Sequence, residues 1–201
     1  MNPKSVSELA LDWWSVALRG ALAVITAVVI VVSPVPHESH LLRIFGTYVL
    51  LDGLLDGGMA AQAARQGQDW RRPLANGVIG VIAGVLSLSG GGLSVAVRAD
   101  IIGLRTLALG VSGIRLARRV RAELPENLPE WLLTACGWGS VVFSVIIFIG
   151  PTIQASVLGR LDWLATLYLL GFGALLLTLA GRLRAISRDP AVMSSPQVAA
   201  R

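Results

Sequence analysis

Long apolar runs without a formal charge are the feature that most constrains what this chain can fold into. Residues 20–37, 73–97 and 131–159 contain no Asp, Glu, Lys or Arg. An α-helix, which satisfies its own backbone hydrogen bonds, needs about 20 apolar residues to cross the hydrocarbon core of a bilayer. The composition agrees, because 54% of the residues are hydrophobic and only 14% are charged, too apolar for a domain that must cover its surface with polar groups. The sequence therefore predicts an all-α membrane protein whose main partner is the lipid bilayer.

Six segments are expected to cross the membrane as helices. They are 13–32, about 41–64, a Gly-rich helix within 73–97, about 100–116, a helix within 131–159 that ends near Pro151, and 163–181. The first segment is as long as a full span and is not followed by a small-residue cleavage site, so it is expected to be an anchor, not a signal peptide. Residues 1–12 are expected to form a short cytoplasmic segment, 13–185 the transmembrane domain, and 186–201 a flexible cytoplasmic tail.

The distribution of basic residues predicts the orientation. When alternate loops are assigned to opposite sides, four of the 17 Lys and Arg residues fall on one side: Arg43, Arg98, Arg105 and Arg160. The other thirteen fall on the opposite side: Lys4, Arg19, Arg65, Arg71, Arg72, Arg115, Arg118, Arg119, Arg121, Arg182, Arg184, Arg188 and Arg201. Cytoplasmic loops carry an excess of Lys and Arg. Both termini are therefore predicted to be cytoplasmic, in a multi-pass protein of the cytoplasmic (inner) membrane.

The net charge of +5 does not indicate a nucleic-acid partner. The basic residues stand in short clusters between apolar runs, and no basic stripe with interleaved stacking aromatics occurs.

Cys136 is the only cysteine, so no disulfide can form within the chain. It is interpreted as a small buried apolar side chain, because no histidine lies near it in the sequence to activate the thiol.

An internal repeat organises the chain into three helical hairpins, at about 13–65, 70–121 and 131–185. In each first helix a Trp precedes a Gly by six or seven residues, in the pairs Trp14 and Gly20, Trp70 and Gly77, and Trp131 and Gly137. A helix breaker follows each of these glycines at +14, namely Pro34, Gly91 and Pro151. A second Gly follows at +33, +33 and +34, namely Gly53, Gly110 and Gly171, with an additional pair at Gly46 and Gly103. A recurrence at a fixed period predicts three copies of one structural unit.

Glycines at matched positions predict where helices approach each other closely. Lipid tails are as apolar as Leu, so helices in a bilayer associate through small residues that let backbones touch. The residues expected in such contacts are Gly20, Gly53, Gly57, Gly77, Gly80, Gly84, Gly110, Gly137 and Gly171.

The chain resembles the HdeD family of short-repeat bacterial membrane proteins over about residues 13–185. The resemblance is carried by Arg19-Gly20 after a Trp, Pro34, Phe45-Gly46, Tyr48, Asp52-Gly53 and the Arg-rich helix ends. It implies a six-helix inner-membrane protein and, in the named member, a role in resistance to acid stress at high cell density. The sequence departs from an even repeat, because the Arg-Gly and Asp-Gly pairs stand only in the first hairpin. Their equivalents are Asn76-Gly77 with Leu109-Gly110, and Cys136-Gly137 with Leu170-Gly171.

Four ionisable residues within the expected spans form a predicted intramembrane charge cluster: Arg19, Asp52, Asp56 and Arg105. Asp52 and Asp56 are one helical turn apart and share a face, and an ionisable group in hydrocarbon is costly unless it is paired or wetted. Matching helix depths predicts that Arg19 pairs with Asp56, with Asp52 as the alternative, and that Arg105 is the better partner of Asp52. The cluster is interpreted as an ion pair that fixes helix register. A proton or ion path and unpaired, snorkelling side chains remain open as alternatives.

No catalytic, cofactor or metal site is predicted. His37 and His40 share one expected outer loop, and their i,i+3 spacing is weak evidence for a metal site.

Two hypotheses for the function of the protein follow from these patterns. In the first, the protein is a non-enzymatic, HdeD-like membrane component associated with acid or envelope stress, which forms homo-oligomers or binds other membrane proteins. In the second, it is a small transporter or channel that handles protons or a small solute through Asp52 and Asp56. Prolines at helix ends, where they do not break helices in mid-membrane, favour the first.

Overall fold

The computed structural model describes residues 13–33, 38–89, 93–120, 130–153 and 161–188. Within these ranges the regular structure is entirely α-helical, and the helices are α2 (Trp13–Val32), α3 (Glu38–Arg65), α4 (Arg71–Leu88), α5 (Val95–Val120), α6 (Glu130–Ile153) and α8 (Leu161–Ser187). Several sequence expectations lie outside the described residues, namely those on 1–12, on Pro34, His37 and Gly91, and on the tail beyond Arg188.

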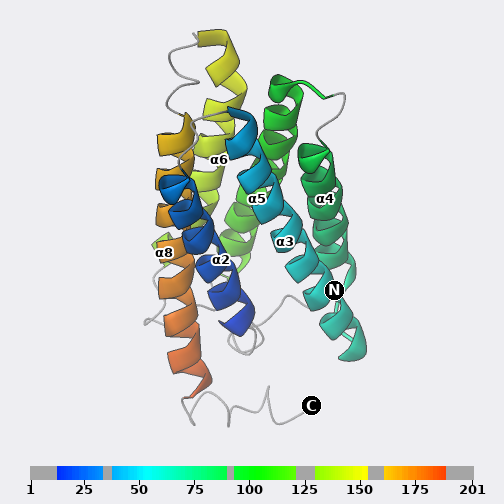
Figure 1. Cartoon of the computed structure of the whole chain (residues 1–201). Helices are drawn as coiled ribbons and strands as arrows, with labels where there is room; N and C mark the ends of the chain where they lie inside the picture. Colours follow the sequence, from blue (N-terminus) through cyan, green and yellow to red (C-terminus); the bar gives the residue numbers. More distant parts are fainter. Residues whose placement is uncertain (1–12, 34–37, 90–92, 121–129, 154–160, 189–201) are drawn as a thin grey trace.

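Consecutive helices run in opposite directions and together form one bundle (Figure 1). The starts of α2, α4 and α6 and the ends of α3, α5 and α8 lie toward the lower end of that view. The first and last described helices therefore begin and end at the same end of the bundle.

The helix boundaries match the sequence expectation for α2 and differ from it elsewhere. The charge-free run 73–97 holds most of α4 and the first residues of α5, because α4 ends at Leu88 and Ser89 adopts an extended conformation (φ −64°, ψ 98°). Arg98, expected in a loop, consequently lies in α5. Pro73 lies in the first turn of α4, where a backbone N–H has no helical partner and its loss is tolerated.

Three further boundaries extend past the sequence expectation. The helix α3 begins at Glu38, so His40 is an exposed residue of its first turn and not part of a loop. The helix α6 continues two residues past Pro151. The helix α8 continues to Ser187, inside the segment expected to be a tail.

Four of the helices are long and apolar enough to cross a membrane: Trp13–Val32, His40–Arg65, Trp131–Ile149 and Trp163–Ala185. These segments belong to α2, α3, α6 and α8. The helix α4 has only 18 residues, and α5 carries charges near both ends as well as Arg105 at its centre. Six spans were expected, and by length and hydropathy four are found in the described part of the chain.

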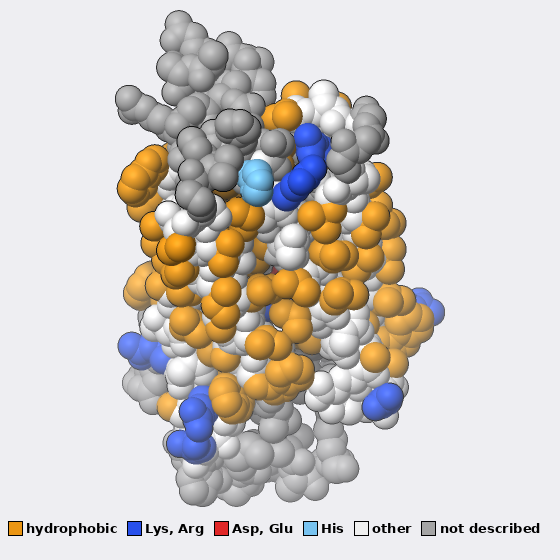
Figure 2. All heavy atoms as spheres, viewed as in Figure 1, with side chains coloured by type: hydrophobic (Ala, Val, Ile, Leu, Met, Phe, Trp, Pro, Cys, Tyr) orange, Lys and Arg blue, Asp and Glu red, His pale blue; other side chains and the backbone are white. Residues whose placement is uncertain are grey.

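The exposed faces of the helices are apolar. Ile25, Val32, Leu104 and Leu167 are each at least 60% exposed. Figure 2 shows hydrophobic side chains over the middle of the visible face, with basic side chains toward its lower end and at one upper point. Such a surface suits lipid and not water, because contiguous exposed apolar patches of this extent are rare on soluble proteins. The protein is therefore a membrane protein whose helices contact lipid.

The helices pack most extensively in the pairs α3 with α4, α5 with α6, and α2 with α8. The pairs that form the expected hairpins, α2 with α3, α4 with α5 and α6 with α8, contact each other less. Each close pair thus joins the second helix of one expected hairpin to the first helix of another.

The core draws residues from all six described helices and is lined by stacked aromatics. On α3, Tyr48 meets Phe45 edge-on, with ring centroids 5.5 Å apart. The stacked series then runs from Phe45 to Phe143 of α6 at 5.8 Å, and on to Tyr168 and Phe172 of α8 at 4.1 and 5.5 Å. Aromatic pairs within this distance range contribute specific packing energy. Small residues such as Ala23, Ala27 and Ala83 fill the remaining core positions on α2 and α4.

Candidate functional site

The candidate site is a cluster of charged side chains from three helices. Asp52 and Asp56 project from the same face of α3, because residues four apart in a helix lie one turn above each other. Arg19 reaches them from α2 and Arg105 from α5. All four residues of the predicted cluster therefore meet in the structure.

Arg105 bridges the two carboxylates. Its Nη2 atom donates to Oδ2 of Asp56 at 3.0 Å and to Oδ2 of Asp52 at 3.3 Å. Arg105 was expected to favour Asp52, but it contacts both residues and lies slightly closer to Asp56. The reason is the single turn between the two aspartates, which is short enough for one guanidinium nitrogen to reach both.

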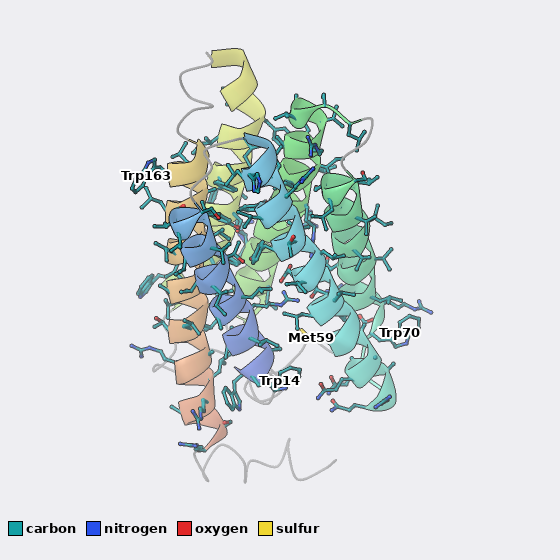
Figure 3. All side chains as sticks on the ribbon, in the orientation of Figure 1. Trp14, Met59, Trp70 and Trp163 are labelled. Atoms are coloured by element: carbon teal, nitrogen blue, oxygen red, sulfur yellow. The ribbon has the colours of Figure 1, made fainter. Side chains whose placement is uncertain are left out.

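Arg19 contacts the same two carboxylates from α2. Its Nη2 atom donates to Oδ1 of Asp56, as the matched helix depths predicted. Its Nε atom lies 3.6 Å from Oδ1 of Asp52, and its Nη2 atom lies 3.8 Å from the sulfur of Met59. Met59 and Trp14 are both toward the lower end of the bundle in Figure 3, so the cluster is nearer to that end than the aromatic core is.

The cluster is buried and balanced in charge. Asp52 and Asp56 are each 4% exposed and Arg105 is 2% exposed, while the side chain of Arg19 is 20% exposed. Two positive and two negative groups give no net charge. Burying an ion is costly unless a partner of opposite charge and further hydrogen bonds compensate. Here each carboxylate meets both guanidinium groups, so each of the four ions has two partners.

Gly80 on α4 provides the space that Arg105 occupies. A Cβ atom on Gly80 would lie 3.2 Å from both Nε and Nη2 of Arg105 and 2.8 Å from the Cα atom of Gly53. The Arg105 side chain therefore passes against the bare backbone of α4 to reach α3. Any side chain at Gly80 would press on both the arginine and the neighbouring helix.

Some guanidinium N–H groups have no hydrogen-bond partner. In the described part of the chain these buried atoms are Nε of Arg19, Nε of Arg98, and Nε and Nη1 of Arg105. Buried donors are normally satisfied by protein or by ordered water. The cluster therefore retains donor capacity beyond the ion pairs.

The predicted packing glycines lie at close helix contacts, with one exception. A Cβ atom at each of the following positions would lie 2.6–2.9 Å from a neighbouring helix: Gly20, Gly53, Gly77, Gly80, Gly84, Gly110 and Gly137. A Cβ atom on Gly57 would meet nothing within 4 Å, but Gly77 lies against the Gly57 backbone.

The exception is Gly171, which is exposed and has no neighbour within 4 Å of an added Cβ atom. Its assignment as a packing residue was wrong. Gly173 takes the contact instead, because an added Cβ atom there would lie 2.7 Å from Val24 and 2.9 Å from the Gly20 carbonyl oxygen. Two residues correspond to about 200° of helix rotation, so Gly171 and Gly173 face opposite directions.

Several polar contacts between helices were not predicted from the sequence. The Ser144 hydroxyl donates to the Gly103 carbonyl at 2.7 Å, and the Ser140 hydroxyl lies 3.0 Å from the Tyr168 hydroxyl. Ser140 and Ser144 are four residues apart on α6, and that spacing within an otherwise apolar run was the available signal. Cys136, one turn before Ser140, is buried as expected.

Comparison of the chain with protein-family models, with curated proteins and with solved structures finds no match. The resemblance to the HdeD family therefore rests on the residues of this chain alone.

The arrangement is suited to holding helices together. No group of three or more His, Cys, Asp or Glu residues that could hold a metal ion occurs among the described residues. The two carboxylates are engaged by arginines. What the site can do chemically is fix the relative positions of α2, α3 and α5, or exchange a proton at a carboxylate if an arginine moves away.

Proposed function

We propose that the chain is a non-enzymatic integral membrane protein in which the charge cluster fixes the register of α2, α3 and α5. The observation that carries this proposal is the closed set of contacts, in which both carboxylates meet both guanidinium groups and the charges cancel. A buried ion pair of this kind specifies which helix positions must meet, because any other register leaves a charge unpaired.

We further propose six membrane spans in three repeated hairpins. The alternating helix directions support the span count, and α4 presents an exposed apolar face with Val78, Ile79, Ile82 and Val85. The repeat is supported by an equivalent glycine contact in each of the three closest helix pairs: Gly53 with Gly77, Gly110 with Gly137, and Gly173 with Gly20. When Gly53, Gly110 and Gly173 are aligned, Tyr48, Arg105 and Tyr168 also align, each five residues earlier.

The proposed cellular role follows the HdeD resemblance. It is a component of the cytoplasmic membrane, with both termini in the cytoplasm, that contributes to resistance to acid or envelope stress. Partners would be lipid, other copies of the chain or other membrane proteins. Survival of host cells at low external pH, with and without the chain, tests this role directly. Equal survival at equal membrane protein content would contradict it.

The second candidate is a small transporter or channel for protons or a small solute. The observation that favours it is the pair of buried carboxylates beside arginine N–H groups that have no hydrogen-bond partner. Against it stands the stacked aromatic series from Phe45 to Phe172, which fills the bundle core.

A flux assay separates the two candidates. The full chain is reconstituted in liposomes under an imposed pH gradient, beside Asp52→Asn, Asp56→Asn and the exposed-loop control Asp69→Asn. We expect proton flux at the level of protein-free liposomes in every case. A flux that requires Asp52 or Asp56 but not Asp69 would replace the structural proposal with the transport one.

A further inference from the structure

Arg98 is a second buried arginine site, separate from the charge cluster. It lies in the first turn of α5, which begins at Val95. The Ser94 side chain caps this turn, because its hydroxyl accepts from the Val97 backbone N–H at 3.2 Å. The Ser94 carbonyl accepts from the Arg98 backbone N–H at 3.1 Å. The start of the helix is therefore fixed, and Arg98 is held within it.

Arg98 is a buried residue, and one of its guanidinium N–H groups has no partner. Arg98 is 7% exposed, and its buried Nε atom has no hydrogen-bond acceptor. Among the described residues no ion pair joins Arg98 to a carboxylate, in contrast to Arg105 and Arg19. Asp100 follows two residues later, but it is exposed and lies about 200° around the helix from Arg98. A buried guanidinium N–H group in this state needs an anion or ordered water.

The position of Arg98 favours an anion. Arg98 and Arg105 are seven residues apart, which is about 10 Å along α5 and within about 20° of the same face. Arg98 is thus nearer to the end of the bundle at which α3 and α5 begin (Figure 1). Helical side chains lean toward the helix N-terminus, where the backbone N–H groups and the helix dipole attract negative charge.

We infer that Arg98 and the N-terminal turn of α5 bind an oxyanion of the phosphate class. A guanidinium group presents paired N–H donors that match phosphate oxygens. A phosphodiester of an anionic lipid and a free phosphate share the chemistry required. The lipid source rests on the proposed spanning of the membrane by α5, which would bring this end of the bundle to the phospholipid headgroups, whereas neither source depends on the role proposed for the charge cluster.

The test uses the full chain in nanodiscs and thermal unfolding. One series raises the fraction of phosphatidylglycerol in phosphatidylcholine. A second adds inorganic phosphate to phosphatidylcholine nanodiscs, with potassium chloride at equal ionic strength as the control. The variants are Arg98→Gln and the matched control Arg43→Gln, which removes an exposed arginine near the start of α3 at the same end.

We expect one of the two anions to raise Tm saturably in the wild type and in Arg43→Gln. For Arg98→Gln the concentration required should rise about tenfold or more, the effect of losing a charge-assisted hydrogen bond. Saturation with phosphatidylglycerol identifies a lipid headgroup, and saturation with phosphate identifies a free anion. An equal response in Arg98→Gln, or no response in the wild type, overturns the inference.

A second measurement covers failure of Arg98→Gln to fold. Native mass spectrometry of the wild type, released from nanodiscs of mixed lipid, reports bound phospholipid or phosphate directly. Retention of an anionic lipid or phosphate in preference to phosphatidylcholine supports the inference. The absence of any such retention, with water left to satisfy Arg98, rejects it.

Discussion

At the residue scale, the charge cluster is a matter of charge balance. Asp52 and Asp56 each meet both Arg19 and Arg105, so the loss of one ion leaves an excess charge in the bundle. The remaining ions keep their desolvation cost, and the compensation for it is reduced. The net charge that a substitution leaves in the cluster should therefore affect the stability of the fold more than the number of charges that it removes.

Single removal should consequently be more harmful than removal of an opposite pair. We expect Arg19→Leu or Asp56→Leu alone to destabilise the fold by about 3–5 kcal/mol, the usual cost of breaking a buried pair. The double variant Arg19→Leu with Asp56→Leu leaves the Arg105 to Asp52 contact of 3.3 Å and should recover part of this loss. Folded protein in membranes, measured by resistance to detergent unfolding, reports the difference.

The matched control is Arg19→Leu with Arg105→Leu, which also removes two charges but leaves two aspartates. It should be worse than either single arginine variant, because like charges one turn apart repel. If this double variant were as stable as Arg19→Leu with Asp56→Leu, charge balance in the cluster would not be what stabilises the bundle.

The four charged residues could be predicted from sequence, but their pairing only in part. Helical periodicity and matched helix depths were enough to predict the contact between Arg19 and Asp56. The bridging of both aspartates by Arg105 depends on how closely α5 approaches α3 and α4. Gly80 of α4 makes this approach possible. A comparison of the depths of α3 and α5 takes no account of the packing of α4. The burial of Arg98 was missed because the fourth helix was expected to begin at about residue 100, whereas α5 begins at Val95 and includes Arg98 in its first turn.

At the element scale, glycines decide which helices touch. The closest contacts join α3 to α4 through Gly53, Gly77, Gly80 and Gly84. An added Cβ atom on Gly84 would lie 2.6 Å from the Cα atom of Leu50, so backbone approaches backbone with no side chain between. Glycine recurrence predicted that close approaches exist. It did not predict which helices form each pair, because the same glycines fit contacts within a hairpin or between hairpins.

Two glycines on α8 provide a direct test of these contacts. Gly173→Ala should destabilise the bundle by about 1–3 kcal/mol, the usual cost of overpacking, because the backbone oxygen of Gly20 cannot easily move away. Gly171→Ala should be neutral or stabilise by up to about 1 kcal/mol, because alanine is the better helix former and the position is open. Thermal unfolding in one detergent compares the two variants. Equal effects would show that the α2 to α8 contact is not close.

At the scale of the whole molecule, the question is how many helices cross the bilayer. Four are long and apolar enough to do so, while α4 is short and α5 is charged. Both lie in the same bundle as the other four and alternate with them in direction (Figure 1). A buried arginine neutralised by two aspartates, as at Arg105, lowers the cost of placing α5 in hydrocarbon. Hydropathy scores that charge as if it were unpaired, so hydropathy alone does not decide whether α5 crosses the bilayer.

Labelling of introduced cysteines from one side of the membrane tests the span count. Gln66 lies in the turn after α3 and Ser94 lies just before α5, and both are exposed. Gln66→Cys and Ser94→Cys are made separately in a Cys136→Ala background, and intact cells are treated with a membrane-impermeant maleimide. If α4 crosses the bilayer, the two positions lie on opposite sides. We expect Ser94→Cys to react in intact cells and Gln66→Cys to react only after permeabilisation. The reason is that Arg65, Arg71 and Arg72 lie close to Gln66 in the sequence, and such basic loops remain in the cytoplasm.

Reaction of both from the same side would mean that α4 does not cross. The opposite labelling pattern would keep the six spans but reverse the orientation.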